Sequence, residues 1–223
     1  MGSAYFSPRL FQFLGQLRRN NRRPWFLKRK DEFEEAARQP CLRFITDLRL
    51  PLRELSPWLV ADPKPIGGSL FRIYRDVRFS SDKSPYKTHI GMNFWHASAS
   101  ETVHAPGLYL HLEPKECFLA GGVWRPDPRS LAQIRDAIAW KPDEWRAAKR
   151  GLELGGDTLT RPPRGYPADH TLIEDLKRKD FVASIDLSQA RVCSGRFMQD
   201  FLASARKMVP LLRFLSSAVK LGF

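Results

Sequence analysis

The sequence has no long hydrophobic run and no recognisable export signal. No stretch of about 18 consecutive apolar residues occurs, which argues against a transmembrane helix. The first residues, MGSAYFSPRL, lack the basic-then-apolar layout of a secretory signal, and Phe6 stands where a myristoylation motif needs Ser or Thr. We therefore expect a cytoplasmic protein with no membrane partner.

Cysteine and the common catalytic motifs are also scarce. The three cysteines, Cys41, Cys117 and Cys193, lie too far apart for a CxxC metal site and are too few for a disulfide framework. The chain contains no GxSxG elbow, no P-loop, no GxGxxG after a strand and no HExxH. The hydrolase, nucleotide-binding and zincin classes thereby lose their main support.

Positive charge is what the sequence has in excess. Its 37 Lys and Arg outnumber 24 Asp and Glu, giving a net charge of +13. Such a balance attracts anionic partners, including nucleic acid. The excess is spread along the whole chain, so the alternative is a set of Arg-rich solvated faces.

Apolar periodicity predicts helices at both ends of the chain. Helical spacing over 7–17 indicates a first helix, and the segment 20–33 opens a longer one that Pro40 and Pro51 are expected to break or kink. Further helices are predicted over 127–140, 142–150, 170–179 and 195–219, the last with a kink at Pro210.

Alternating apolar and polar residues predict strands in the middle of the chain. The predicted strands cover 70–79, 88–96, 107–114, 116–124 and 181–187, and the third and fourth form a hairpin. Helices that flank mainly antiparallel strands are typical of the α+β class. We expect one domain over residues 1–223, with a mainly antiparallel central sheet between N-terminal and C-terminal helices.

Several blocks of unusual composition support a family resemblance. The segments FRIYRDVRFSSDKSPYKTHIG, GLYLHLEPKECFLAGGVWRPDP, RPPRGYPADH and PLLRFL occur in this order along the chain. They resemble a family of uncharacterised bacterial proteins catalogued only as a domain of unknown function. The resemblance covers about residues 5–215 and leaves 1–4 and 216–223 as terminal extensions. It implies no activity, substrate or catalytic residue.

The densest polar cluster lies in and after the first predicted strand. It combines guanidinium, ammonium and phenol groups, which suit a phosphate or a carboxylate. Its members are Arg72, Tyr74, Arg75, Arg78, Lys83, Tyr86 and Lys87. The alternative is a structural ion network, in which Asp76 and Asp82 pair with these bases.

Strand parity extends this cluster into a candidate pocket floor. If the strands are neighbours, their polar positions share one face of the sheet. That face would carry Arg72, Tyr74, Asp76, Arg78, His89, Asn93, Tyr109, His111 and Glu113. Arg164, on the proline-stiffened loop RPPRGYPAD, is a candidate rim residue. The alternative is a polar face that is merely wetted by solvent.

Two kinds of chemistry are open to this face. His111 with Glu113 or Asp76 could transfer protons near neutral pH. His89, His111 and Glu113 also resemble a two-histidine, one-carboxylate metal triad. HxE pairs are common by chance, however, and the nearby Arg72 and Arg78 disfavour a dication. We therefore expect no metal and no other cofactor.

The leading functional hypothesis is a pocket for a small anionic ligand. Arg72, Arg75, Arg78 and Lys87 would bind that anion, so Arg78→Glu is expected to abolish binding. One alternative is a nucleic-acid-binding protein, whose affinity would fall steeply with salt. Another is a protein-interaction module with a flat polar face. Nothing in the sequence indicates an oligomeric state.

Overall fold

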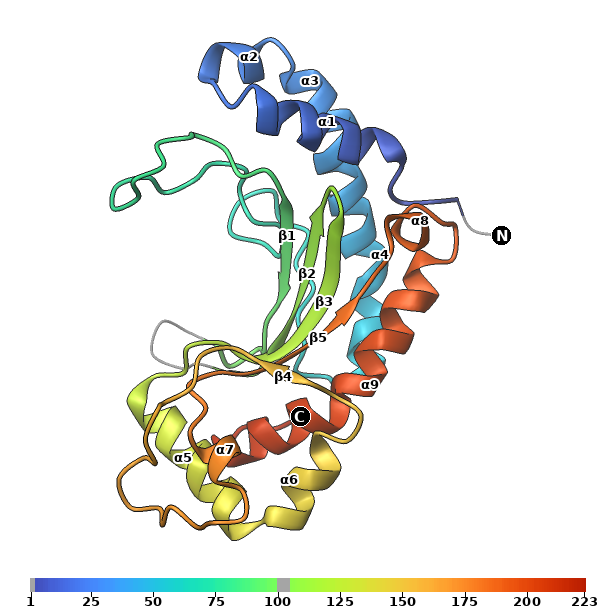
Figure 1. Ribbon diagram of the computed structural model, residues 1–223. Coiled ribbons are helices and arrows are strands. Elements are labelled where there is room, and N and C mark those ends of the chain that lie inside the picture. Colours follow the sequence, from blue (N-terminus) through green and yellow to red (C-terminus); the bar gives the residue numbers. More distant parts are fainter. Residues whose placement is uncertain (1–2, 100–104) are drawn as a thin grey trace.

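The centre of the molecule is an antiparallel sheet with the strand order β1-β2-β3-β5-β4. The computed structural model describes residues 3–99 and 105–223 (Figure 1). The strands are β1 (Ile90–Phe94), β2 (Gly107–Glu113), β3 (Glu116–Val123), β4 (Leu154–Gly155) and β5 (Phe181–Asp186). The structure therefore has the α+β class that the sequence predicts.

Side-chain alternation gives the sheet two different faces. In β2, Leu108, Leu110 and Leu112 are fully buried, while the residues between them point to the opposite side. Strand β1 pairs with β2 so that Met92 lies opposite Leu110, and this register places the apolar sides of both strands on one face. Lys115 takes a positive φ of 73° in the tight turn from β2 to β3.

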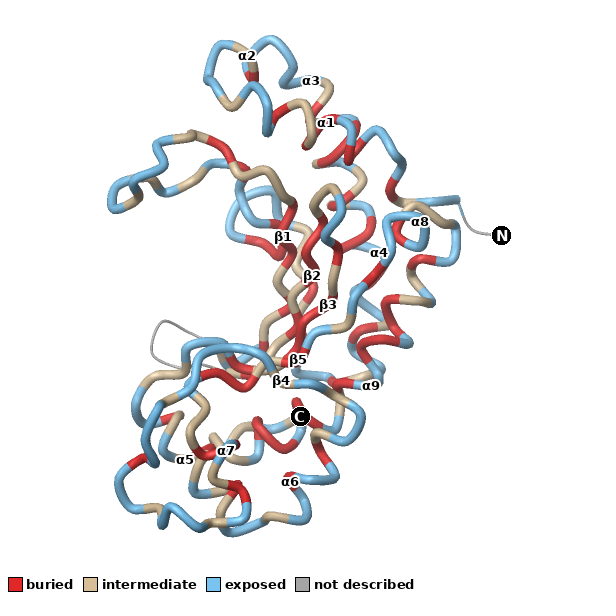
Figure 2. The backbone as a smooth tube through the Cα atoms, in the orientation of Figure 1, coloured by how far each residue is buried: buried red, intermediate tan, exposed pale blue. Residues whose placement is uncertain are grey.

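Helices cover the apolar face of the sheet. Figure 1 shows α4 (Gln39–Leu55) and α9 (Phe197–Ala218) on the same side of the strands. The N-terminal helices α1 (Pro8–Arg19), α2 (Arg23–Leu27) and α3 (Lys30–Phe33) lie at one end, with α8 (Gln189–Val192) nearby. One large hydrophobic core joins them to the sheet. Figure 2 shows this buried layer along α4, α9 and the strands.

A second, smaller core lies at the other end of the sheet. It is built by α5 (Pro128–Trp140), α6 (Pro142–Ala148) and α7 (Ile173–Leu176), which pack around the C-terminal half of α9. Trp145 is fully buried there, with its ring edge-on to Phe181 of β5. The sheet thus connects two groups of helices and leaves its second face without a helix (Figure 1).

The strand predicted over 70–79 is wrong, because these residues form a loop. Only isolated bridges occur there, between Leu70 and Met92 and between Tyr74 and Tyr86. The chain folds back on itself, since the Arg75 N–H donates to the carbonyl of Pro85 and the Lys87 N–H to the carbonyl of Ile73. We call residues 71–86 the basic loop.

Two helix predictions also need correction. The long second helix is divided into α2, α3, a π-helical turn η1 (Glu34–Arg38) and α4. Pro40 lies in the first turn of α4, where no backbone donor is needed, and Pro51 lies inside α4 without ending it.

Within residues 3–99 and 105–223, no helix has both the length and the apolar character needed to cross a bilayer.

Candidate functional site

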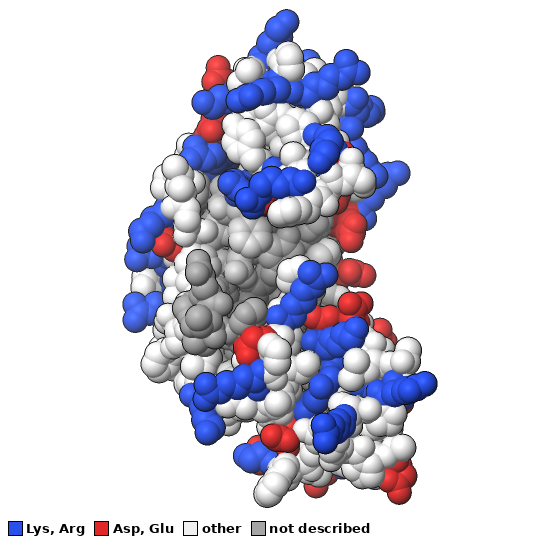
Figure 3. Space-filling view, turned by 90° about the vertical axis from the view of Figure 1, so that its left-hand side faces the viewer, with Lys and Arg blue, Asp and Glu red and all other residues white. Residues whose placement is uncertain are grey.

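The helix-free face of the sheet carries the polar side chains predicted from segments 88–96 and 107–114, but not those predicted from 70–79. We call it the open face. Its residues are Gly91 and Asn93 of β1, Tyr109, His111 and Glu113 of β2, and Phe118 and Ala120 of β3. Figure 3 shows this side of the molecule hollowed between two rims that bear Lys and Arg. A concave surface is the usual setting of a small-molecule site.

Two histidines and a glutamate converge on the open face. His89, His111 and Glu113 place one ligand atom each within 4.8 Å of one another. His111 Nε2 lies 3.4 Å from Glu113 Oε2, and the two imidazole rings are 4.6 Å apart. We call these three residues the His–Glu cluster. Parity in β2 predicts that His111 and Glu113 point the same way, and the β1–β2 register, which the sequence does not show, brings His89 to them.

Neighbouring side chains hold the His–Glu cluster in place. The His111 ring stacks on Phe118, with 4.7 Å between ring centroids and 5° between planes. Its Nδ1 atom lies 3.3 Å from the Tyr109 hydroxyl. Thr88 Oγ1 donates a hydrogen bond to Glu113 Oε1 at 3.0 Å. Contacts on several sides fix the ring of His111 and the carboxylate of Glu113.

Burial sets the protonation of the groups around this cluster. Desolvation, assisted by the neighbouring His111, lowers the pKa of His89 to about 4, so its imidazole is neutral at neutral pH. Burial and the charge of Glu113 raise the pKa of Tyr109 to about 12. The Tyr109 phenol therefore keeps its proton at neutral pH.

Lys87 is a half-buried cation beside this cluster. Its Nζ atom lies 5.1 Å from the ring centroid of Phe71, and that ring is 6.0 Å from the ring of Tyr109. Burial, and then the positive charge of Arg72, lower the pKa of Lys87. In the described parts of the chain, no carboxylate lies within ion-pair distance of its ammonium group.

The basic loop, in contrast, satisfies most of its own charges. Arg78 binds Asp76 with a shortest N–O distance of 2.7 Å, and Arg75 binds Asp82. Arg78 holds the pKa of Asp76 at about 2. These pairs match the structural ion network considered from the sequence. Asp76 is exposed and bonded to Arg78, and it is not among the groups that gather around His111.

The structure disperses the remaining predicted residues. Tyr86 is only 1% exposed and stacks on Phe26 at 4.2 Å, so it belongs to the core. Tyr74 is half exposed beside it. Lys83 is exposed and donates to the carbonyl of Val77 at 3.0 Å. Arg164 is exposed on the loop after β4.

Some residues of the site carry no clear sequence signal. Phe118 could be found, because it falls opposite His111 in the predicted hairpin. Thr88 could not, since its bond to Glu113 depends on the path of the chain into β1. Gly91 has a steric reason: a Cβ atom there would lie 2.6 Å from the Tyr109 hydroxyl. A side chain at Gly91 would push Tyr109 away from His111.

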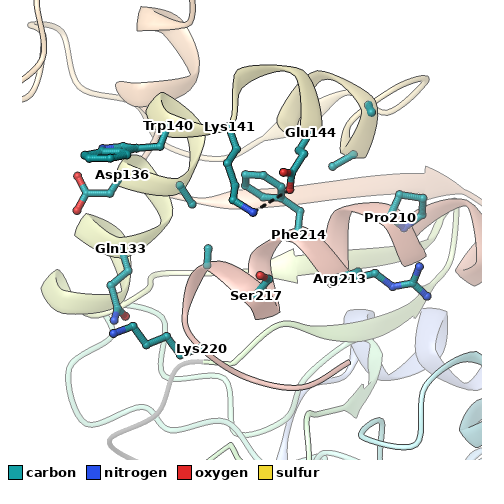
Figure 4. A pocket seen from close by; sticks show the side chains of 14 residues that line it. Gln133, Asp136, Trp140, Lys141, Glu144, Pro210, Arg213, Phe214, Ser217 and Lys220 are labelled. Carbon is teal, nitrogen blue, oxygen red and sulfur yellow. Dashed lines mark hydrogen bonds and ion pairs between the residues drawn. The ribbon is translucent and has the colours of Figure 1, made fainter.

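Two cavities differ in their relation to this site. One, of about 550 Å³, lies beside the open face and is lined in part by Phe71, Arg72 and Trp95. The larger, of about 1090 Å³, lies between α5, α6 and α9 (Figure 4). Lys141 and Glu144 form an ion pair in it, but it contains none of the predicted site residues. Of the predicted site residues, only Arg72 lines the smaller cavity, which does not include Lys87 or the His–Glu cluster. We therefore place the candidate site on the open face, with the smaller cavity beside it.

Comparison with known proteins gives a family. No curated protein matches this chain. A family model described as "Conserved hypothetical protein (DUF2461)" matches residues 9–214, which is nearly the whole chain and agrees with the resemblance noted from the sequence blocks. The chain therefore belongs to the conserved hypothetical protein family DUF2461.

Proposed function

We propose that the open face binds a small anionic ligand, such as a phosphate or a carboxylate, beside the His–Glu cluster. The observation that carries this proposal is Lys87. It is half buried, and in the described residues it has no carboxylate within ion-pair distance. An ammonium group that has lost part of its water without gaining a counter-ion gives a strong reason for an anion to bind.

The neighbours of Lys87 favour the same ligand. Arg72 is close enough for its charge to lower the pKa of Lys87, and its side chain also lines the cavity of about 550 Å³. An anion between the two cations would relieve their repulsion and accept hydrogen bonds from both. Phe71 and Trp95 give the cavity apolar walls, as in most small-ligand sites.

The other members of the open face supply polar and reactive groups. Asn93 and Tyr109 lie opposite each other in the β1–β2 ladder. They offer hydrogen-bond donors to a ligand that reaches the sheet. His111 and Glu113 follow Tyr109 on the same face of β2, where they could transfer protons to or from the bound molecule. Lys87 and Arg72 would bind the anion, and the His–Glu cluster would transfer a proton to or from it.

The proposal is tested with inorganic phosphate and pyrophosphate as probes. Calorimetric titration at constant ionic strength should give saturable binding to the full chain. Lys87→Gln should weaken that binding at least about tenfold, because one charge-assisted hydrogen bond is lost. Lys83→Gln is the matched control, since Lys83 is an exposed lysine of the basic loop that donates to a backbone carbonyl. Equal affinities of the two variants would contradict the proposal.

Nucleic acid is the competing ligand, and Figure 3 supplies the observation that favours it. Lys and Arg side chains occupy both rims of the hollow side. Salt separates the two proposals. Duplex binding should weaken with a log–log slope of about 0.9 per phosphate contact, whereas a small anion held by two cations should respond much less. Tight duplex binding unaffected by Lys87→Gln would favour the rims over the pocket.

A further inference from the structure

We infer that the His–Glu cluster is a binding site for one divalent transition-metal ion, with His89, His111 and Glu113 as its protein ligands. These residues combine two imidazoles with one carboxylate, a set that suits Zn²⁺ or Fe²⁺. Three protein ligands leave coordination positions for water or a substrate. The inference deepens the proposed function, because an anion held by Lys87 could occupy such a position.

The distances are close to those that a metal needs. Metal–ligand bonds of about 2.0 to 2.1 Å put neighbouring ligand atoms about 3.0 to 3.4 Å apart in octahedral or tetrahedral geometry. Glu113 Oε2 and His111 Nε2 are already 3.4 Å apart. All three ligand atoms lie within 4.8 Å of one another, so the remaining distances need to close by about 1.8 Å at most. A rotation of the half-buried His89 ring can supply that movement.

The contacts of Tyr109 and Thr88 with the His–Glu cluster leave His111 Nε2 and Glu113 Oε2 available as metal ligands. Tyr109 contacts His111 at Nδ1, which leaves Nε2 directed toward Glu113. Thr88 binds Oε1 of Glu113, and Oε2 is the oxygen that faces His111. Metal-binding imidazoles and carboxylates usually have such a partner on the atom that does not touch the metal. The open face therefore has the outer contacts of a built site as well as its ligands.

Lys87 and Arg75 carry positive charges that act on His89 in the structure, and an anion bound at Lys87 would offset them. The electrostatic objection raised from the sequence names other residues. It rests on Arg72 and Arg78 as neighbours of the triad. Arg78 is bonded to Asp76, with its side chain 76% exposed, and Arg72 lies at the cavity beside Phe71. Arg18 does reach Glu113, but it is exposed and lies 3.9 Å from Oε1, not from the oxygen that faces His111. Water screens an exposed charge of this kind.

Titration with Co²⁺ tests the site directly. The full chain, stripped of metal and free of any histidine tag, should bind one Co²⁺ and show the visible absorption of a coordinated ion. Glu113→Gln and His89→Asn should each weaken binding more than 100-fold, and Tyr109→Phe, which removes a positioning contact, about 10- to 100-fold. His170→Asn is the matched control, since His170 instead accepts a hydrogen bond from the Leu172 N–H.

Two outcomes would overturn the inference: no 1:1 binding by the full chain, or equal affinity in Glu113→Gln, His89→Asn and His170→Asn. Circular dichroism of each variant separates lost binding from lost folding, and the two ligand variants change different parts of the chain, the segment before β1 and strand β2. Lys87→Gln keeps all three ligands and removes a positive charge near His89, so it should bind Co²⁺ at least as tightly as the unchanged chain while losing phosphate. Failure of the metal site and failure of the anion site are therefore distinguishable.

Discussion

The basic loop and the open face teach different things about where a site can form. The loop has the densest charge in the sequence, yet two of its three arginines, Arg78 and Arg75, meet carboxylates two and seven residues away. The open face has fewer charges, and the fold collects them from β2 and the segment before β1. Lys87 at its edge has no carboxylate partner in the described parts of the chain. A half-buried cation without a nearby carboxylate therefore indicates the candidate site better than the density of charged residues along the sequence does.

The largest effect should come from removing the anchor of the basic loop. Tyr86 is 1% exposed and stacks on Phe26. The Asn21 side chain donates a hydrogen bond to the Tyr86 carbonyl and accepts one from the Tyr86 N–H. Tyr86→Ala should lower the free energy of unfolding by about 3 to 5 kcal/mol, the usual cost of deleting a buried aromatic ring. Urea-induced unfolding measures this change.

Tyr74→Ala is the control for that prediction. Tyr74 is another tyrosine of the same loop, but it is half exposed, so its loss should cost far less. Equal destabilisation by the two variants would mean that Tyr86 is not a core residue. The prediction from the sequence that Tyr86 binds a ligand would then regain support, and the candidate site would include Tyr86.

A smaller effect is expected on the open face itself. In Gly91→Ala the added Cβ would lie 2.6 Å from the Tyr109 hydroxyl and 3.1 Å from the ring of Phe71. Both side chains have to move, which typically costs about 1 to 3 kcal/mol. Because Tyr109 then leaves His111, Co²⁺ affinity should fall together with the midpoint of urea unfolding.

Gly155→Ala provides the comparison, because an added Cβ at Gly155 meets nothing within 4 Å. Gly155 also lies in a strand, at the edge of the same sheet. It should therefore leave both stability and Co²⁺ affinity unchanged. A Gly91→Ala protein that matches Gly155→Ala in both measurements would show that Tyr109 does not position the His–Glu cluster.

Local pattern predicts much of this fold, and long-range pairing explains where it fails. Parity in β2 places Tyr109, His111 and Glu113 on one face, because alternation needs no knowledge of neighbouring strands. The same alternation over 70–79 predicts a strand that does not form. Only its first residues bond to β1, through the Phe71 N–H and the carbonyl of Gly91, and the rest bonds back to residues 85–87. Phe79 is 96% exposed. A pattern can show that a segment could be a strand, but not which partner it meets.

The approach of His89 to His111 shows the same limit at the candidate site. It depends on the register that sets Ile90 opposite Leu112, and these residues are far apart in the sequence. A shift of one residue would put His89 on the core face. The sequence therefore identifies the members of the cluster without showing that they meet.

The smallest effect is predicted for Arg78. From the sequence alone, a charge change at Arg78 is expected to abolish anion binding, but its ion pair with Asp76 changes that expectation. Both side chains are exposed, so Arg78→Gln should leave stability nearly unchanged. It should also leave phosphate affinity unchanged, whereas the same substitution at Lys87 weakens it. The two variants lose the same charge, so only the position differs between them.

The pKa of Asp76 supplies an independent measurement for this variant. Its value of about 2 is due first to the hydrogen bonds from Arg78, so in Arg78→Gln it should rise toward its usual range. A depressed carboxyl pKa stabilises the fold above the unfolded pKa and loses this effect as the pH falls toward 2. NMR titration of the Asp76 carboxyl measures the shift. If that shift occurs and phosphate binding is also lost, Arg78 does more than neutralise Asp76, and the anion site extends beyond Arg72 to Arg78.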